Sequence, residues 1–145
     1  MAALILDHFL PYRLSVASNA VSARISQSYR RKFGLKIPEW RLIAILAEQD
    51  SMTPIDIGKA GALDKITVSR AATALIDRGL VQQRRHPGDG RSHFLLLTGE
   101  GRALYADIAP LALAMEARLL ADFSDKERAI LARLLRRIEW SADAA

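Results

Sequence analysis

The stretch that decides the fold is Asp64–Thr98, which reads DKITVSRAATALIDRGLVQQRRHPGDGRSHFLLLT. Apolar residues recur at helical spacing in its first half, so we predict a helix over Lys65–Arg78 that Asp64 caps and Gly79 ends. Two short runs that favour strands follow, joined by a turn with a proline and two glycines, which predicts a hairpin. The tip of this hairpin, Arg84–Arg91, carries three arginines, and a function has to account for them.

The sequence around this stretch predicts further helices with clear starts. Pro38 suits a first helical turn, Thr53 caps the sequence TPID, and Thr98 and the capping box at Ser124–Glu127 (SDKE) mark two later starts. Glycines stand where the first, third and fourth helices should end. We therefore expect helices close to residues 11–33, 38–49, 54–61, 65–78, 99–121 and 125–140. Pro110 should kink or interrupt the fifth.

The order of elements over Pro38–Thr98 is helix, short helix, glycine-containing turn, helix and hairpin. This is the pattern of a helix-turn-helix followed by a wing. In the second helix of this motif, Lys65–Arg78, the residues that should be buried form one stripe: Val68, Ala72, Leu75 and Ile76. The opposite face carries Ile66, Arg70, Thr73 and Asp77, with Thr67 and Ser69 on its flank. Arginine bonds guanine through two hydrogen bonds and hydroxyls reach bases or phosphates, so this face suits a DNA major groove.

Positive charge is concentrated in the same segment. The chain has a formal net charge of +5, and Lys65–Arg91 holds six lysines and arginines against two aspartates. Such a balance favours nucleic acid, an anionic membrane surface or anionic ligands as partners. A narrow basic hairpin after a recognition helix can follow the DNA backbone to the next minor groove, which favours DNA. The alternative for Arg84 and Arg85 is a solvated strand edge, charged to prevent aggregation.

At this point the sequence resembles the MarR family of winged-helix transcription regulators. The resemblance rests on IPEWRLIAIL at 37–46, DKITVSRAATALIDRGLVQQRR at 64–85, DGRSHFLLLT at 89–98 and GEGRALY at 99–105. It implies that Arg91 of the wing enters a minor groove and that Asp89 holds the wing arginines in place. It also implies contacts from the recognition helix through Thr67, Ser69 and Arg70. The chain departs from the family before RGLV, where AATALID is smaller and less charged.

The predicted fold class is therefore mainly α (α+β), with a winged helix-turn-helix unit between dimerisation helices. We divide it into an N-terminal dimerisation region at 1–36, the DNA-binding domain at 37–98 and C-terminal dimerisation helices at 99–145. The residues expected to contact double-stranded DNA are Lys65, Thr67, Ser69, Arg70, Thr73, Arg84, Arg85 and Arg91. The family is dimeric, and the apolar ends of this chain independently favour a homodimer, because a small monomer would expose them as a large patch.

The resemblance also implies a small aromatic or phenolic acid as ligand, in a cleft between the dimerisation and DNA-binding parts. Candidate residues for it are His8, Tyr12, Arg13 and Trp40, because an arginine beside aromatic rings can hold a carboxylate. The alternative, which we favour for Trp40, is a core position on the second helix, and Arg13 is then simply exposed. The three histidines (His8, His86 and His93) are scattered and there is no cysteine, so we expect neither a metal site nor a cofactor.

The favoured function is a homodimeric, sequence-specific regulator, a ligand-responsive repressor on a pseudo-palindromic operator. One alternative is a winged-helix protein-interaction module, but such a module needs no arginines at the wing tip. Another is a sequence-neutral architectural DNA binder, which shares the charge argument. An enzyme is not expected, because no nucleophile–base pair and no phosphate-binding glycine loop is found. Neither a signal peptide nor an uncharged run of membrane-spanning length is seen, so we expect a cytoplasmic protein without a membrane partner.

Overall fold

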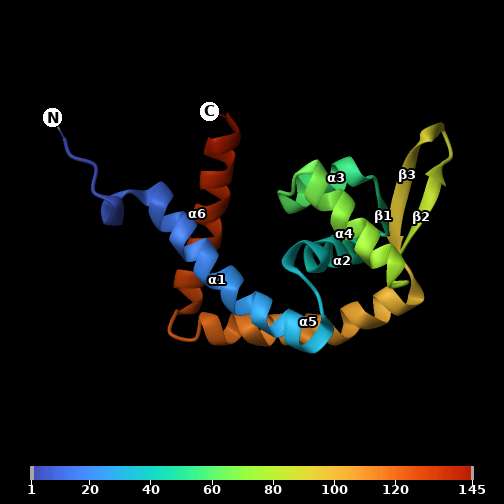
Figure 1. The fold of residues 1–145 in the computed structure, drawn as a ribbon. Coiled ribbons are helices and arrows are strands. Elements are labelled where there is room, and N and C mark those ends of the chain that lie inside the picture. Colours follow the sequence, from blue (N-terminus) through green and yellow to red (C-terminus); the bar gives the residue numbers. More distant parts are fainter. Residues whose placement is uncertain (1, 145) are drawn as a thin grey trace. The chain divides into compact units, whose positions relative to one another are not determined.

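The computed structural model describes residues 2–144, apart from the side chains at positions 86 and 89–92. The helices of this range are α1 (Leu10–Phe33), α2 (Ile37–Gln49), α3 (Pro54–Gly61), α4 (Lys65–Asp77), α5 (Gly99–Leu119) and α6 (Asp125–Ala144), preceded by the 3-10 turn η1 (Leu6–His8). The strands are β1 (Ser51–Met52), β2 (Val81–His86) and β3 (Asp89–Leu97) (Figure 1). The predicted fold class, mainly α with a winged helix-turn-helix, is confirmed.

The first long helix ends where its glycine predicts. Gly34 adopts a left-handed conformation with φ of 63°, which glycine reaches without steric cost. Its N–H donates to the carbonyl of Arg30, and the next N–H, of Leu35, donates to the carbonyl of Tyr29 at 3.3 Å. The chain therefore leaves α1 in a tight turn that buries Leu35 completely.

The core of the winged unit lies where α2, α3 and α4 meet. Leu42, Ile43 and Leu46 of α2 are fully buried there, together with Ile57 of α3. From α4 the buried residues are Val68, Ala71, Ala72 and Leu75. Three residues of the predicted stripe, Val68, Ala72 and Leu75, are therefore buried as expected, and Ala71 takes the place of Ile76. Ile76 falls at the edge of this stripe and is only half-buried.

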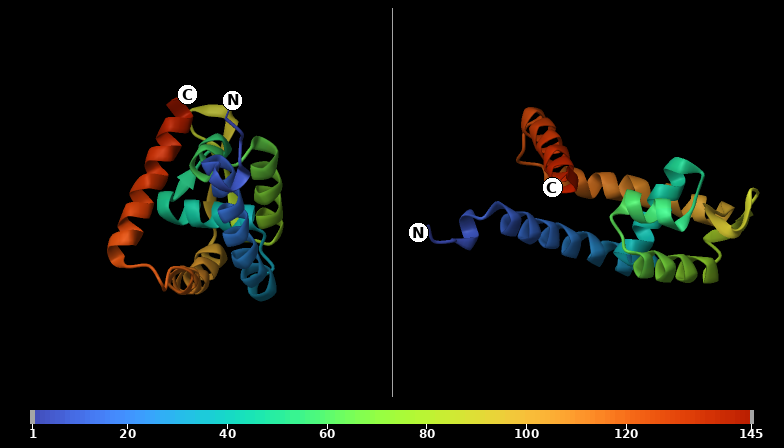
Figure 2. Two further views of the ribbon diagram at one scale, coloured as in Figure 1. Left: turned by 90° about the vertical axis from the view of Figure 1, so that its left-hand side faces the viewer. Right: turned by 90° about the horizontal axis from the view of Figure 1, so that it is seen from above.

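The sheet is antiparallel, with the strand order β1-β3-β2. Strands β2 and β3 form the predicted hairpin, whose base is anchored by buried Val81, Leu95 and Leu97 and whose tip projects beyond α2 and α4 (Figure 2). Strand β1 was not predicted. It has two residues, too few for an alternating pattern, and it pairs with residues far along the chain, Ser51 with Leu96 and Met52 with Leu95.

Helix α5 starts at a junction that joins it to the recognition helix and the wing. The Thr98 hydroxyl accepts a hydrogen bond from the N–H of Gly101 at 3.0 Å, as expected of a capping residue, and donates to the carbonyl of Gly79 at 2.7 Å. The N–H of Thr98 donates to the carbonyl of Leu80. A Cβ atom on Gly101 would lie 2.1 Å from that same Leu80 oxygen. Only glycine therefore fits at position 101 without a backbone shift.

Helix α5 continues past Pro110, so this proline does not interrupt it as one of the two expectations had it. Proline removes one hydrogen bond inside the helix, but Ala106 and Pro110 are both exposed, so water can reach the unpaired carbonyl.

The chain forms two compact units, residues 1–107 and 108–145. In the second unit, the predicted capping box is present: the Ser124 N–H donates to Glu127 and the Glu127 N–H donates to the Ser124 hydroxyl. Among the described residues, no helix is long and apolar enough to cross a membrane.

We predict that Gly101→Ala destabilises the protein by about 2 kcal/mol, because the new methyl group overlaps the Leu80 carbonyl and strains the junction. The matched control is Gly99→Ala, where an added Cβ meets nothing within 4 Å. This control should be neutral or stabilise by about 0.5 kcal/mol, because alanine favours a helix. Urea unfolding followed by circular dichroism measures both. Equal stabilities for the two variants would show that the close approach at position 101 is unimportant.

Candidate nucleic-acid interface

The exposed face of α4 carries half of the polar residues that the sequence assigned to DNA. Lys65, Ser69, Arg70 and Thr73 are all exposed, whereas the opposite face of the helix is buried in the core. Arg70 and Thr73 stand one and two helical turns after Ile66, so they share one face with it. Among the described ion pairs and hydrogen bonds, none engages Arg70, and its guanidinium is open to solvent. This face can therefore donate hydrogen bonds to a partner without losing contacts of its own.

Asp64 fixes the start of this helix. Its carboxylate accepts a hydrogen bond from the backbone N–H of Thr67 at 2.7 Å and a second one from the Thr67 side chain. These hydrogen bonds, the backbone one first, lower the pKa of Asp64 below its ordinary value. Thr67 is half-buried and takes part in this cap, whereas Ser69 and Arg70 are exposed. Among the three recognition-helix residues that the family resemblance names, Thr67 thus has a structural role of its own.

The turn between α3 and α4 differs in detail from what its glycine predicts. The left-handed residue is Ala62, with φ of 53°, and not Gly61. A Cβ atom on Gly61 would lie 3.0 Å from the end of the Ile45 side chain, so the glycine here matters for space and not for its backbone freedom. A Cβ on Gly58 would similarly lie 2.9 Å from the Leu63 carbonyl. Both glycines therefore lie in tightly packed surroundings next to the turn.

The wing places its two described arginines on opposite faces of the hairpin. Arg84 pairs with Phe94 and Arg85 with His93, and successive residues of a strand point to opposite sides. Both arginines are exposed. Two further residues assigned by the sequence, Asp89 and Arg91, have side chains that lie outside the described residues. A partner that lies on one side of the hairpin would therefore directly contact only one of Arg84 and Arg85.

Arg78 has a structural role that its sequence position did not reveal. It was counted with the basic residues of the segment, but its guanidinium donates hydrogen bonds to the carbonyls of Phe33 and Gly34, at 3.0 and 3.3 Å. These carbonyls end helix α1, so Arg78 connects the C-terminal ends of α1 and α4. Because its partners are more than forty residues away in sequence, no local pattern could identify this contact.

A residue that sequence reasoning missed is Lys59 on α3. It is exposed and lines an apolar groove of about 320 Å³ between α3 and α4. Lys65 of the recognition helix lines the same groove, together with Ile55 and Leu63. The sequence could have indicated this residue, because Lys59 lies near the end of the first helix of the helix-turn-helix. Two lysines thus line one groove at the start of the recognition helix.

The four residues assigned to a ligand do not form one group within a single chain. His8, Tyr12 and Arg13 are exposed near the N-terminus, and Arg13 forms an ion pair with Asp7 at 3.7 Å. Trp40 instead lies between Tyr29, at 5.1 Å between ring centres, and Tyr105, at 6.2 Å and nearly parallel. Tyr12 and Tyr29 are separated along α1 by about 25 Å, from the rise of about 1.5 Å per residue. Burial raises the pKa of the Tyr29 phenol, so this aromatic group is neutral.

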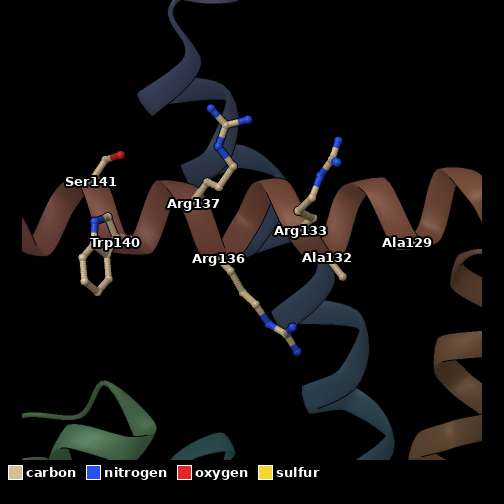
Figure 3. A pocket seen from close by; sticks show the side chains of 7 residues that line it. All are labelled: Ala129, Ala132, Arg133, Arg136, Arg137, Trp140 and Ser141. Atoms are coloured by element: carbon tan, nitrogen blue, oxygen red, sulfur yellow. The ribbon is translucent and has the colours of Figure 1, made fainter.

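The C-terminal helix α6 has two different faces. Ile130, Leu131, Leu134, Leu135 and Ile138 form an apolar stripe that is 37–44% exposed. The other face carries a shallow hollow of about 390 Å³, lined by residues that include Ala129, Arg133, Arg136, Arg137 and Trp140. Figure 3 shows that Arg133 and Arg137 point to one side of the helix and Arg136 and Trp140 to the other.

Among the described residues, no group of three or more histidines and acidic residues could hold a metal ion.

The exposed face of α4, the lysine-lined groove and the basic hairpin define a winged helix-turn-helix protein of the DNA-binding class. A family model described as the MarR family matches residues 33–92. An uncharacterised HTH-type transcriptional regulator of Bacillus subtilis, YwoH, is 33% identical over 104 residues, which cover 72% of this chain and 75% of that protein. The chain therefore belongs to the MarR family. It is a transcriptional regulator and not an enzyme.

Solved structures agree with this assignment. A MarR/EmrR family transcriptional regulator from Acinetobacter sp. ADP1 is 27% identical and superposes with a TM-score of 0.90, covering 98% of this chain and 100% of that one. The PcaV transcriptional regulator from Streptomyces coelicolor, solved in complex with its natural ligand, is 26% identical with a TM-score of 0.79. The two alignments cover 98% of this chain each, so the similarity extends beyond the winged unit.

We predict that Asp64→Ala lowers the unfolding temperature, because the N–H of Thr67 loses its acceptor, whereas Asp64→Asn keeps a capping oxygen and stays closer to wild type. A lowered pKa in the folded state means that the charged carboxylate stabilises the fold above its unfolded pKa of about 3.9. This stabilisation is lost as the pH falls through the lower folded pKa. The difference between wild type and Asp64→Ala should therefore shrink between neutral and strongly acidic pH in thermal unfolding. A difference that does not change with pH would contradict the charged cap.

Proposed function

We propose that the protein is a homodimeric, sequence-specific DNA-binding repressor that acts in the cytoplasm on a pseudo-palindromic operator and responds to a small ligand. The observation that carries the proposal is the face of α4, where exposed Lys65, Ser69, Arg70 and Thr73 stand on a helix whose other side is locked in the core. A recognition helix of this kind presents its N-terminal part to base edges in the major groove. Lys59 and at least one of Arg84 and Arg85 would contact phosphates on either side of it, and Arg91 and Asp89 complete the proposed wing contact.

The homodimer is supported by apolar surface that a single chain leaves exposed. The apolar stripe on α6 is partly exposed, whereas a surface helix normally turns its apolar face toward the core. The N-terminal segment carries a second apolar set, namely Leu4, Ile5, Leu6, Phe9 and Leu10, each 42–71% exposed. A two-fold dimer that covers these surfaces presents two copies of α4 to half-sites about one helical turn apart, which is the reason to expect a pseudo-palindrome.

The ligand is supported by the aromatic cluster of Tyr29, Trp40 and Tyr105. Arg13, exposed elsewhere on α1 and paired with Asp7, is the cation proposed for its carboxylate. PcaV, which shares the fold over nearly the whole chain, was solved with its natural ligand. Since His8, Tyr12 and Arg13 lie far from Trp40 within one chain, a site that uses all four needs residues of a second chain. A ligand that prefers one spacing of the two recognition helices would shift the population of dimers toward it.

The sharpest test compares two arginines of the same segment. Arg70 is exposed and makes none of the described hydrogen bonds, whereas Arg78 donates two hydrogen bonds to the end of α1. On a duplex selected from a random library, Arg70→Ala should weaken binding at least about tenfold and relax the sequence preference. Arg78→Ala should keep that affinity but lower the unfolding temperature by roughly 3–5 °C, because two carbonyls lose their donor. Fluorescence anisotropy and thermal unfolding measure the two effects.

Each contrary outcome of this test identifies one of the alternatives. If wild type binds all duplexes equally and binding falls steeply with salt, at a slope near −5 for about six neutralised phosphates, the protein is a sequence-neutral architectural binder. If no duplex is bound at any salt concentration, the protein-interaction module is favoured. If Arg78→Ala loses affinity as strongly as Arg70→Ala while remaining folded, the assignment of roles to these two arginines is wrong.

A second test addresses the dimer. We predict that Leu134→Arg converts the protein into a monomer of 16.0 kDa, because a charge then lies in the centre of the apolar stripe on α6. The matched control is Ala129→Arg, which adds the same side chain to the opposite face beside Arg133 (Figure 3) and should leave the dimer intact. Light scattering after size exclusion gives the masses. A wild-type monomer, or a dimer that tolerates both changes, would contradict the proposal.

A further inference from the structure

Ile66 is an apolar residue that the core does not use. It is the second residue of α4 and 64% exposed, whereas the buried side of this helix is completed by Val68, Ala71, Ala72 and Leu75. One exposed isoleucine is ordinary on a protein surface and needs no explanation by itself. Its position therefore has to carry the argument.

This position is the N-terminal part of the face that the proposed function places against DNA. Arg70 and Thr73 follow Ile66 on the same face, and Lys65 and Ser69 flank it. All the other exposed residues of α4 are polar or charged, so Ile66 is the one apolar group that this helix offers to a partner. Helix stability does not account for it either, because a β-branched residue is a poorer choice than alanine, lysine or glutamate on an exposed helical surface.

The major groove offers one apolar group that distinguishes bases, the C5-methyl group of thymine. Residues in the first turn of a recognition helix are the ones that come closest to base edges. We propose that Ile66 is a specificity-determining residue, which packs on a thymine methyl group in each half-site while Arg70, one turn further along, bonds the edge of a neighbouring base. This inference rests on the proposed function, since it requires α4 to enter the major groove.

The contact distinguishes thymine from cytosine in a way that charge cannot. A cytosine at that position has no methyl group, so the isoleucine would remove water from a polar base edge without gaining an apolar partner. Loss of one buried methyl contact should weaken binding about fourfold for each half-site, from the transfer free energy of such a group. The effect is small compared with that of Arg70, but it is confined to one base position.

The test uses a duplex selected by the wild-type protein from a random library, synthesised again with deoxyuridine in place of single thymines. Deoxyuridine keeps the hydrogen-bonding groups and lacks only the methyl group. At one thymine of each half-site, the change should weaken wild-type binding about fourfold and should leave the affinity of Ile66→Ala unchanged. The matched control is Ile55→Ala on α3, an isoleucine that is 69% exposed. This variant should keep the full dependence on the thymine methyl group.

Three outcomes would overturn the inference, and they are distinguishable. If deoxyuridine has the same effect on wild type and on Ile66→Ala at every thymine, Ile66 reads no methyl group although the protein binds DNA. If Ile55→Ala also loses the dependence, the effect is not specific to Ile66. If the library yields no enriched duplex, the proposed function itself fails, and the inference fails with it. Circular dichroism checks that Ile66→Ala is folded, which we expect because the side chain is exposed.

Discussion

The close approach of Gly101 to the carbonyl of Leu80 is the constraint on which the winged unit depends. At this point the chain passes from α4 into β2 and returns from β3 into α5, and three segments are joined by the hydrogen bonds of Thr98. The hairpin therefore leaves the helical body from a fixed base, with Val81 and Leu97 paired and buried beside it. A recognition helix and a wing can meet a duplex together only if their relative position is set in this way.

The fold also decides which of the basic side chains are available to a partner. Counting basic residues identifies Lys65–Arg91 as the surface for an acidic partner, but the count treats all arginines alike. In the structure Arg78 is bound to two backbone carbonyls, whereas Arg70 is exposed on the face of α4. The free charge on the proposed DNA-binding side is thus smaller than the sequence count, and Lys59, outside the counted segment, adds to it.

Local signals in the sequence predicted most of the fold, because helix starts and ends depend on neighbouring residues. Gly34, Asp64 and the Ser124–Glu127 capping box all act within a few positions of themselves. What could not be predicted depends on partners far along the chain, such as the pairing of β1 with β3 or the donation from Arg78 to α1. The exposed face of α4 was predictable because helical spacing fixes it. The part that Thr67 takes in the cap of Asp64, and the groove beside Lys59, are seen only in the folded structure.

The bond between α1 and α4 has a consequence for how a ligand would act. Arg78 holds the C-terminal end of the recognition helix to the carbonyls of Phe33 and Gly34, and Tyr29, one turn earlier on α1, contacts Trp40 of α2. A ligand that displaced the aromatic cluster would therefore act on the same end of α1 that Arg78 holds. Since packed elements move between discrete arrangements and do not deform continuously, a shift of α1 would carry the end of α4 with it. In a two-fold dimer, both recognition helices would move, and their spacing is the quantity that a pseudo-palindromic site reads.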